Sequence, residues 1–102
     1  MNYTVVDNQD ESRYEIFDGD LRVGLVQYRR APHQISFVHT ETDPVAQGRG
    51  FGSRLIEHVL QDARGAGIAV LPFCPFVRRF IAENDEYLDL VPGDRRGAFG
   101  LE

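Results

Sequence analysis

QGRGFGSRL, residues 47–55, places three glycines directly before an apolar pattern of helical spacing. Glycine costs backbone entropy and weakens the start of a helix. The stretch therefore predicts one of two things: either the chain makes a tight turn here, or another molecule approaches the backbone closely. The elements on either side bear on the choice.

The residues after the loop predict a helix, a buried strand and a second helix. The apolar run 68–73 (IAVLPF) indicates a buried strand that lies parallel to the strand before the first helix. Pro75 suits the first turn of a second helix over 75–84. RGAG at 64–67 is typical of a helix C-terminus, and it follows a helical pattern made by Leu55, Ile56, Val59, Leu60 and Ala63.

The residues before the loop predict an antiparallel meander. Turn-forming residues separate four segments with strand character, at 3–6, 13–17, 21–30 and 34–42. The predicted fold class is therefore α+β (α/β): an antiparallel strand meander, then a β-α-β crossover and a second helix. We expect a single domain over residues 1–92, with a last short strand at 87–91, and a loose tail over 93–102.

Composition and charge exclude several classes of protein. A length of 102 residues suits one core, and a net charge of −5 argues against a nucleic-acid binder that relies on bulk positive charge. No apolar run approaches the roughly 20 residues that span a bilayer, and no signal-peptide pattern opens the chain. We therefore expect a cytoplasmic protein without nucleic-acid or membrane partners.

Metal and disulfide sites are not expected. The single cysteine, Cys74, excludes a disulfide framework and a cysteine-rich zinc site. His33, His39 and His58 are scattered along the chain and form no ligand pattern.

The glycine loop lies between a predicted strand and the first turn of its crossover helix. Backbone N–H groups there have no helical partner, and the helix dipole adds partial positive charge, so a phosphate or diphosphate is the natural occupant. Gly48, Gly50 and Gly52 permit close approach, Arg49 adds a charge and Ser53 adds a hydroxyl. The alternative is a plain tight turn whose glycines permit close packing. The polar residues on both sides of Gly48 favour the anion site.

Two familiar phosphate-binding loops do not fit this stretch. The P-loop ends in Gly-Lys-Ser/Thr, and the stretch contains no lysine. The dinucleotide-binding fingerprint needs a wider glycine spacing and a β-α-β start, whereas this loop follows a strand-rich half.

Residues 47–52, QGRGFG, resemble the Arg/Gln-x-x-Gly-x-Gly/Ala signature of the GCN5-related N-acetyltransferases (GNAT). HTETDPVAQGRGFGSRLIEHVL (39–60) and VLPFCPFVRRFIAEN (70–84) are similar to the small YjdJ-type branch. Members of that branch are near this length and carry a Cys-Pro or Cys-Ser element after the apolar strand. The resemblance covers residues 15–91 and implies a compact GNAT-like acyl-coenzyme A N-acyltransferase fold.

The resemblance implies acetyl-coenzyme A (acetyl-CoA) as co-substrate, with no metal. The loop amides would hold its diphosphate, and the backbone of Glu41 and Thr42 would pair with the pantetheine arm like an added strand. This requires the strand ending at Asp43 and the strand at 68–73 to part and leave a slot. The residues implied in binding are Thr42, Gln47, Gly48, Arg49, Gly50, Phe51, Gly52 and Ser53.

Cys74 precedes Pro75 and is the expected N-cap of the second helix. The dipole at a helix start stabilises a thiolate, and the position follows the strand that would line the slot. Cys74 would act either as a nucleophile that takes the acetyl group or as the proton donor to the departing coenzyme A (CoA) thiolate. The alternative is a small buried apolar residue, which free cysteine most often is.

His39 and Glu41 alternate on one face of the preceding strand and are candidate acceptors for the proton of an attacking amine. The alternative is a solvated strand face, which is favoured slightly for Glu41. Arg78 and Arg79 are candidates for the 3′-phosphate or adenine of the coenzyme, although surface solvation is the commoner role of a single arginine.

The leading hypothesis is an acetyltransferase that moves the acetyl group of acetyl-CoA to a primary amine. The chain is shorter than a typical GNAT member and lacks the first helices that help form the acceptor pocket. This predicts an open site, suited to an amine on a protein or another exposed acceptor, which a homodimer would complete. The alternatives are a non-catalytic module that binds acetyl-CoA or acts as a scaffold, and a binder of another phosphoryl ligand.

Overall fold

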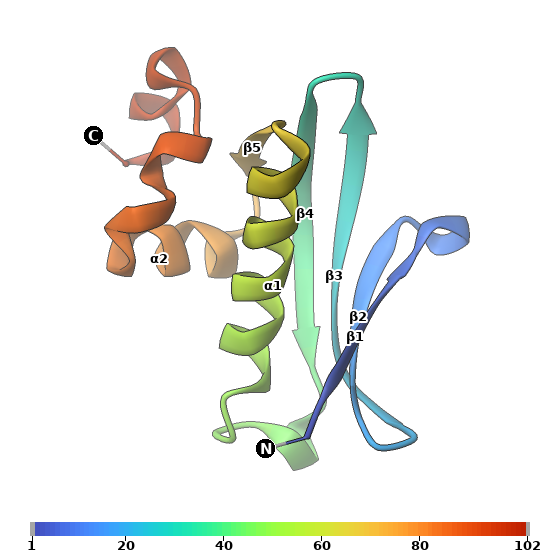
Figure 1. Cartoon of the computed structure of the whole chain (residues 1–102). Helices are drawn as coiled ribbons and strands as arrows, with labels where there is room; N and C mark the ends of the chain where they lie inside the picture. Colours follow the sequence, from blue (N-terminus) through green and yellow to red (C-terminus); the bar gives the residue numbers. More distant parts are fainter. Residues whose placement is uncertain (1, 102) are drawn as a thin grey trace.

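The computed structural model describes residues 2–101, apart from the side chain of Val45. Met1 and Glu102, at the outer ends of the ranges 1–92 and 93–102, lie outside the described residues. Five strands form one sheet in the order β1-β2-β3-β4-β5 (Figure 1). The first four are antiparallel and β5 is parallel to β4. The strands are β1 (Thr4–Asn8), β2 (Arg13–Asp18), β3 (Leu21–Ala31), β4 (Gln34–Thr42) and β5 (Ala69–Pro72).

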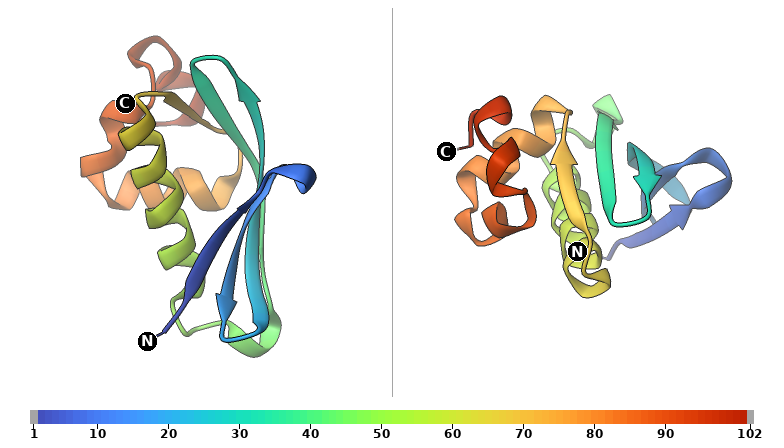
Figure 2. Two further views of the ribbon diagram at one scale, coloured as in Figure 1. Left: turned by 45° about the vertical axis from the view of Figure 1, so that its right-hand side comes forward. Right: turned by 90° about the horizontal axis from the view of Figure 1, so that it is seen from above.

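Helix α1 (Phe51–Ala66) forms the crossover between β4 and β5 and follows a short 3₁₀ turn, η2 (Pro44–Ala46). Its apolar stripe is buried against one face of the sheet, which confirms the predicted α+β fold class. The helix ends where Gly67 adopts a left-handed conformation with φ 69° and donates to the carbonyl groups of Ala63 and Arg64. Among residues 2–101, no α-helix lies on the opposite face of β2, β3 and β4 (Figure 2). Among the described helices, none is long and apolar enough to span a membrane.

After β5, the regular elements among the described residues are one α-helix and three 3₁₀ turns. Helix α2 (Pro75–Glu83) is followed by the 3₁₀ turns η3 (Asp85–Leu90), η4 (Gly93–Arg95) and η5 (Gly97–Phe99). The predicted strand at 87–91 is wrong, because a 3₁₀ turn places Tyr87 and Leu90 on one buried face. The expected loose tail is also packed as far as Leu101. Phe99 and Leu101 are buried, and the Leu101 N–H donates to the Arg96 carbonyl at 2.9 Å.

A β-bulge interrupts the pairing of β3 with β4. Gln27 pairs with His39, but the next residue, Tyr28, pairs with Phe37. Val38 is therefore an extra residue in β4, and the alternation of side chains shifts by one position after it.

The bulge decides which side chains of β4 face α1. Beyond it, Thr40 and Thr42 lie on the helix side, and the Thr42 Cγ2 atom is 3.3 Å from the place a Cβ atom would take at Gly52 of α1. His39 and Glu41 alternate with them and therefore lie on the open face of the sheet.

Tyr28 makes the stability of the fold sensitive to alkaline pH. Burial, followed by the hydrogen bond that its hydroxyl donates to Asp7 Oδ1 at 2.6 Å, raises the pKa of Tyr28 to about 12. The ordinary pKa is near 10. The folded state therefore holds this proton more tightly, and the resulting stability is complete below pH 10 and is lost as the pH rises through 12.

We expect the free energy of unfolding to fall by about 2 kcal/mol between pH 9 and pH 12 through this group, in proportion to its pKa shift. Tyr28→Phe should start less stable, because it loses the bond to Asp7, and should fall less steeply with pH. Urea unfolding followed by circular dichroism at pH 9, 10, 11 and 12 measures both proteins. An equally steep fall in the variant would contradict the assignment.

Candidate functional site

The strands β4 and β5 part partway along their length. Their parallel pairing runs only from Gln34 with Ala69 to Phe37 with Pro72. One further bond, from the Cys74 N–H to the Phe37 carbonyl at 2.9 Å, ends the contact. β4 continues to Thr42, whereas the segment after β5 turns into α2. The register therefore confirms the expected parting and leaves one edge of β4 without a neighbouring strand.

The free edge of β4 carries backbone groups of two threonines. The Asp43 N–H donates to the Val23 carbonyl at 2.8 Å, so Asp43 directs its amide toward β3. Because the groups of an antiparallel strand alternate between its two sides, the N–H and C=O of Thr42 and Thr40 point toward the slot. The backbone groups of Glu41, which were expected there, face β3 instead.

The glycine loop leaves several amides free at the head of α1. Gly48 and Gly50 both have φ 83°, and Gly50 is the N-cap of α1 without a side-chain capping bond. Within the described part of the chain, the N–H groups of Gly48 and of residues 50–53 have no internal acceptor. Those of Gln47 and Arg49 bond internally, to the carbonyl groups of Pro44 and Ala46. The unpartnered N–H groups form a site of positive potential suited to an anion.

The charge of Arg49 lies beside the loop. Its guanidinium is 3.8 Å from Asp18 Oδ2 and 5.3 Å from the centre of the Phe51 ring. The Phe51 ring itself is buried in the core. Arg49 can therefore offer a ligand an exposed charge, and Phe51 can offer only its backbone amide.

A cleft of about 420 Å³ joins the loop to the slot. Thr42 from β4 and Phe76 from α2 complete its wall. A Cβ atom at Gly52 would lie 2.8 Å from Phe76 Cζ, so this glycine permits close packing of the two helices. Gly48 and Gly50 therefore serve the backbone conformation and Gly52 serves close packing within the protein, as the tight-turn alternative expects, while the anion site stays a prediction.

Cys74 lies where the strands part. It is the N-cap of α2, as expected, and is buried, with 4% of its surface exposed. Its Sγ atom is 3.1 Å from Thr40 Oγ1, and either atom can donate. The side chain makes no capping bond to α2. Thr40 was not predicted as a site residue, because only the bulge turns it toward Cys74. Phe76 was not predicted either, because its contact with Gly52 joins residues that are far apart in the sequence.

His39 and Glu41 are brought together, but on the open face. His39 Nε2 and Glu41 Oε2 are 3.0 Å apart, and their side chains are 53% and 60% exposed. Cys74 meets Thr40 on the opposite side of β4. The three predicted catalytic residues therefore flank the slot from its two faces and do not form one cluster.

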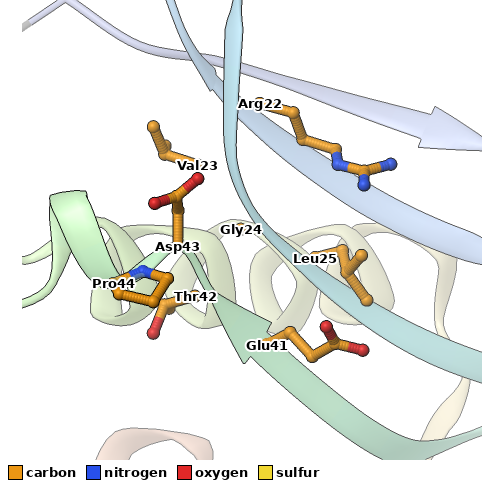
Figure 3. Close-up of a pocket in the computed structure, with 8 residues that line it drawn as sticks. All are labelled: Arg22, Val23, Gly24, Leu25, Glu41, Thr42, Asp43 and Pro44. Atoms are coloured by element: carbon orange, nitrogen blue, oxygen red, sulfur yellow. The ribbon is translucent and has the colours of Figure 1, made fainter.

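A second hollow, of about 220 Å³, lies across the ends of β3 and β4 (Figure 3). It shares Thr42 with the cleft at the loop. The carboxylates of Glu41 and Asp43 line it but point in different directions (Figure 3). The hollow therefore does not form a paired acid site.

The remaining candidates are peripheral. Arg78 Nη2 donates to the Phe73 carbonyl at 3.4 Å, and exposed Arg79 lines a hollow of about 150 Å³ beside Ser53 and Phe76. His58 Nε2 is 3.6 Å from Asp62 Oδ2 on the surface of α1. No group of three or more potential metal ligands occurs among the described residues.

A family model described as GCN5-related N-acetyl-transferase matches residues 13–90. No curated protein matches the chain. Among solved structures, a GCN5-like candidate N-acetyltransferase from Staphylococcus aureus is 22% identical, with TM-score 0.63 and 88% of each chain covered. The ribosomal-protein-S18-alanine N-acetyltransferase from Escherichia coli is 17% identical, with TM-score 0.55 over 57% of this chain. A candidate GNAT acetyltransferase from Bacteroides thetaiotaomicron is 21% identical, with TM-score 0.52 over 74% of this chain.

These likenesses differ in extent. The chain spans 38% of the Escherichia coli protein and 44% of the Bacteroides protein, but 88% of the Staphylococcus protein. At these identities the solved structures establish the fold, and the match over residues 13–90 establishes the family.

Proposed function

Since the chain belongs to the GCN5-related N-acetyltransferase family, we propose that it transfers the acetyl group of acetyl-CoA to a primary amine on a protein or another exposed acceptor. Within the family, we assign it to the small YjdJ-type branch on residues 39–60 and 70–84, which include the Cys74-Pro75 element. The observation that carries the proposal is the set of unpartnered N–H groups at the start of α1, next to the slot between β4 and β5.

The glycine loop fits the diphosphate of acetyl-CoA. Five N–H groups, of Gly48 and residues 50–53, are free to donate, and the helix dipole favours negative charge at the same place. Gly48 and Gly50 expose these amides without a Cβ atom, and nothing lies within 4 Å of the places their Cβ atoms would take. Arg49 adds an exposed cation.

The slot fits the pantetheine arm. The free N–H and C=O groups of Thr42 and the free C=O group of Thr40 would bond to the amides of the arm, as a neighbouring strand would. This extends the expected role of Thr42 and gives to Thr40 the role first expected of Glu41. The Thr40 N–H would also polarise the thioester carbonyl near the point where the strands part.

Cys74 supports two routes of transfer. In the first, the amine attacks the thioester carbonyl directly, a C–N bond forms, the C–S bond breaks, and the Cys74 thiol gives a proton to the CoA thiolate. In the second, the Cys74 sulfur attacks the thioester carbonyl, its thiol proton passes to the CoA sulfur as the C–S bond to CoA breaks, and the amine then attacks the Cys74 thioester and releases the Cys74 sulfur. His39 or Glu41 would accept the proton that the amine loses in either route.

Two assays together test the proposed function. Calorimetric titration with desulfo-CoA measures binding, and the release of free thiol from acetyl-CoA in the presence of primary amines measures transfer. We expect binding that free ATP competes for weakly, and thiol release that depends on the amine. Binding without amine-dependent release would favour a non-catalytic acetyl-CoA-binding module, and the absence of binding would contradict the proposal.

A further inference from the structure

Two exposed apolar side chains flank the point where β4 and β5 part. Val38, the extra residue of the bulge, is 36% exposed, and Phe73 is 47% exposed. They adjoin the hydrogen bond from the Cys74 N–H to the Phe37 carbonyl: Val38 follows the acceptor residue, and Phe73 precedes the donor residue. We call these two residues the apolar patch.

The apolar patch and the His39–Glu41 pair lie on the same face of the sheet. Pro72, the last residue of β5, pairs with Phe37, which is buried on the helix side, so we place the next residue, Phe73, on the open face. The bulge leaves Val38 exposed next to His39, which pairs with Glu41 on that face. The two apolar side chains and the His39–Glu41 pair therefore lie on the same face of the sheet, along β4 from the point where the strands part.

The aromatic member of the patch is held in place by the C-terminal segment. The rings of Phe73 and Phe99 are 5.2 Å apart and nearly perpendicular, at 80°. Phe99 is buried and carries the Arg95 guanidinium 5.8 Å from its ring centre. Phe73 is thus packed against Phe99 while about half of its surface stays exposed.

We propose that this face selects a lysine whose neighbouring residue in the acceptor protein is aromatic or large and apolar. The apolar neighbour would rest on Val38 and Phe73, and the Glu41 carboxylate would attract the ammonium group before it loses its proton. No helix covers this face of β2, β3 and β4, so an extended acceptor segment has access (Figure 2). The inference rests on the proposed function and names its substrate class.

Two peptides test this selection directly. Both are blocked pentapeptides with one lysine, which is flanked by phenylalanine in one and by glycine in the other. We expect kcat/KM for thiol release to be about tenfold higher with the phenylalanine peptide, as burial of part of one aromatic side chain implies. Most of the difference should lie in KM.

Phe73→Ala should reduce that preference to less than about twofold while leaving desulfo-CoA binding unchanged. Leu21→Ala is the matched control, because Leu21 is exposed but lies in the β2–β3 turn region, outside the patch. Val38→Ser is a second test should Phe73→Ala prove unstable by circular dichroism, and it should also weaken the preference.

Several outcomes would overturn the inference. Equal kcat/KM for the two peptides, or a preference that survives Phe73→Ala and Val38→Ser, removes the apolar patch from recognition. Transfer of the acetyl group to small amines but to neither peptide also overturns the inference, and it does not contradict the proposed function. Failure to bind desulfo-CoA removes the proposed function and the inference together.

Discussion

Gly50→Asp is expected to weaken desulfo-CoA binding by about 100-fold, equivalent to about 2.8 kcal/mol. Gly50 is the N-cap of α1, and its φ of 83° is a conformation that aspartate tolerates better than most residues. An aspartate here would accept hydrogen bonds from the amides of the first turn and bring a negative charge to the place the diphosphate needs. Isothermal titration calorimetry measures the loss.

Gly67→Asn is the matched control for that substitution. Gly67 caps the other end of α1, has φ 69°, and has nothing within 4 Å of the place its Cβ atom would take. Both variants therefore place a polar side chain on a left-handed residue at an end of α1. If Gly50→Asp bound desulfo-CoA as tightly as Gly67→Asn, the loop would not hold the diphosphate.

Cys74→Ala is expected to lower kcat by about 100-fold, the usual contribution of a proton donor or nucleophile, with little change in desulfo-CoA affinity. Alanine fits the same small buried space, and the loop that holds the diphosphate is untouched. Steady-state thiol release measures kcat, and calorimetry measures affinity. Full activity of the variant would show that transfer is direct and does not use this thiol.

Intact mass after mixing with acetyl-CoA alone separates the two roles of Cys74. A gain of one acetyl group in the parent protein, absent from Cys74→Ala, assigns the nucleophilic route. No gain, together with the loss of kcat, assigns the proton donor. Thr40→Val is a useful companion, because it removes the hydroxyl 3.1 Å from Cys74 Sγ without a large change in volume.

Local patterns in the sequence were sufficient for the five strands of the sheet, for the two α-helices and for the position of the glycine loop between them. The helical spacing after Gly52 and the turn at Gly67 both correspond to features of α1. The prediction of a strand at 87–91 was wrong because the apolar residues of YLDLV fit two different periodicities. Alternation suits a strand, while the three-residue spacing of Tyr87 and Leu90 suits the 3₁₀ turn that buries both.

The remaining features depend on how segments that are distant in the sequence align and pack, which local patterns do not show. The bulge at Val38 depends on how β3 and β4 align, and it places His39 and Glu41 on the face opposite Cys74. The close approach of Phe76 to Gly52 joins two helices that the sequence separates. The packed tail had apolar residues at 99 and 101, but their burial depends on surfaces formed by distant elements.

A crystal structure of the protein with bound desulfo-CoA tests the central claim most directly. We predict density for the diphosphate within hydrogen-bonding distance of the free amides at Gly48 and residues 50–53, and for the pantetheine arm along Thr42 and Thr40 toward Cys74. Density elsewhere on the surface, or strands β4 and β5 closed against each other with the ligand excluded, would contradict the account.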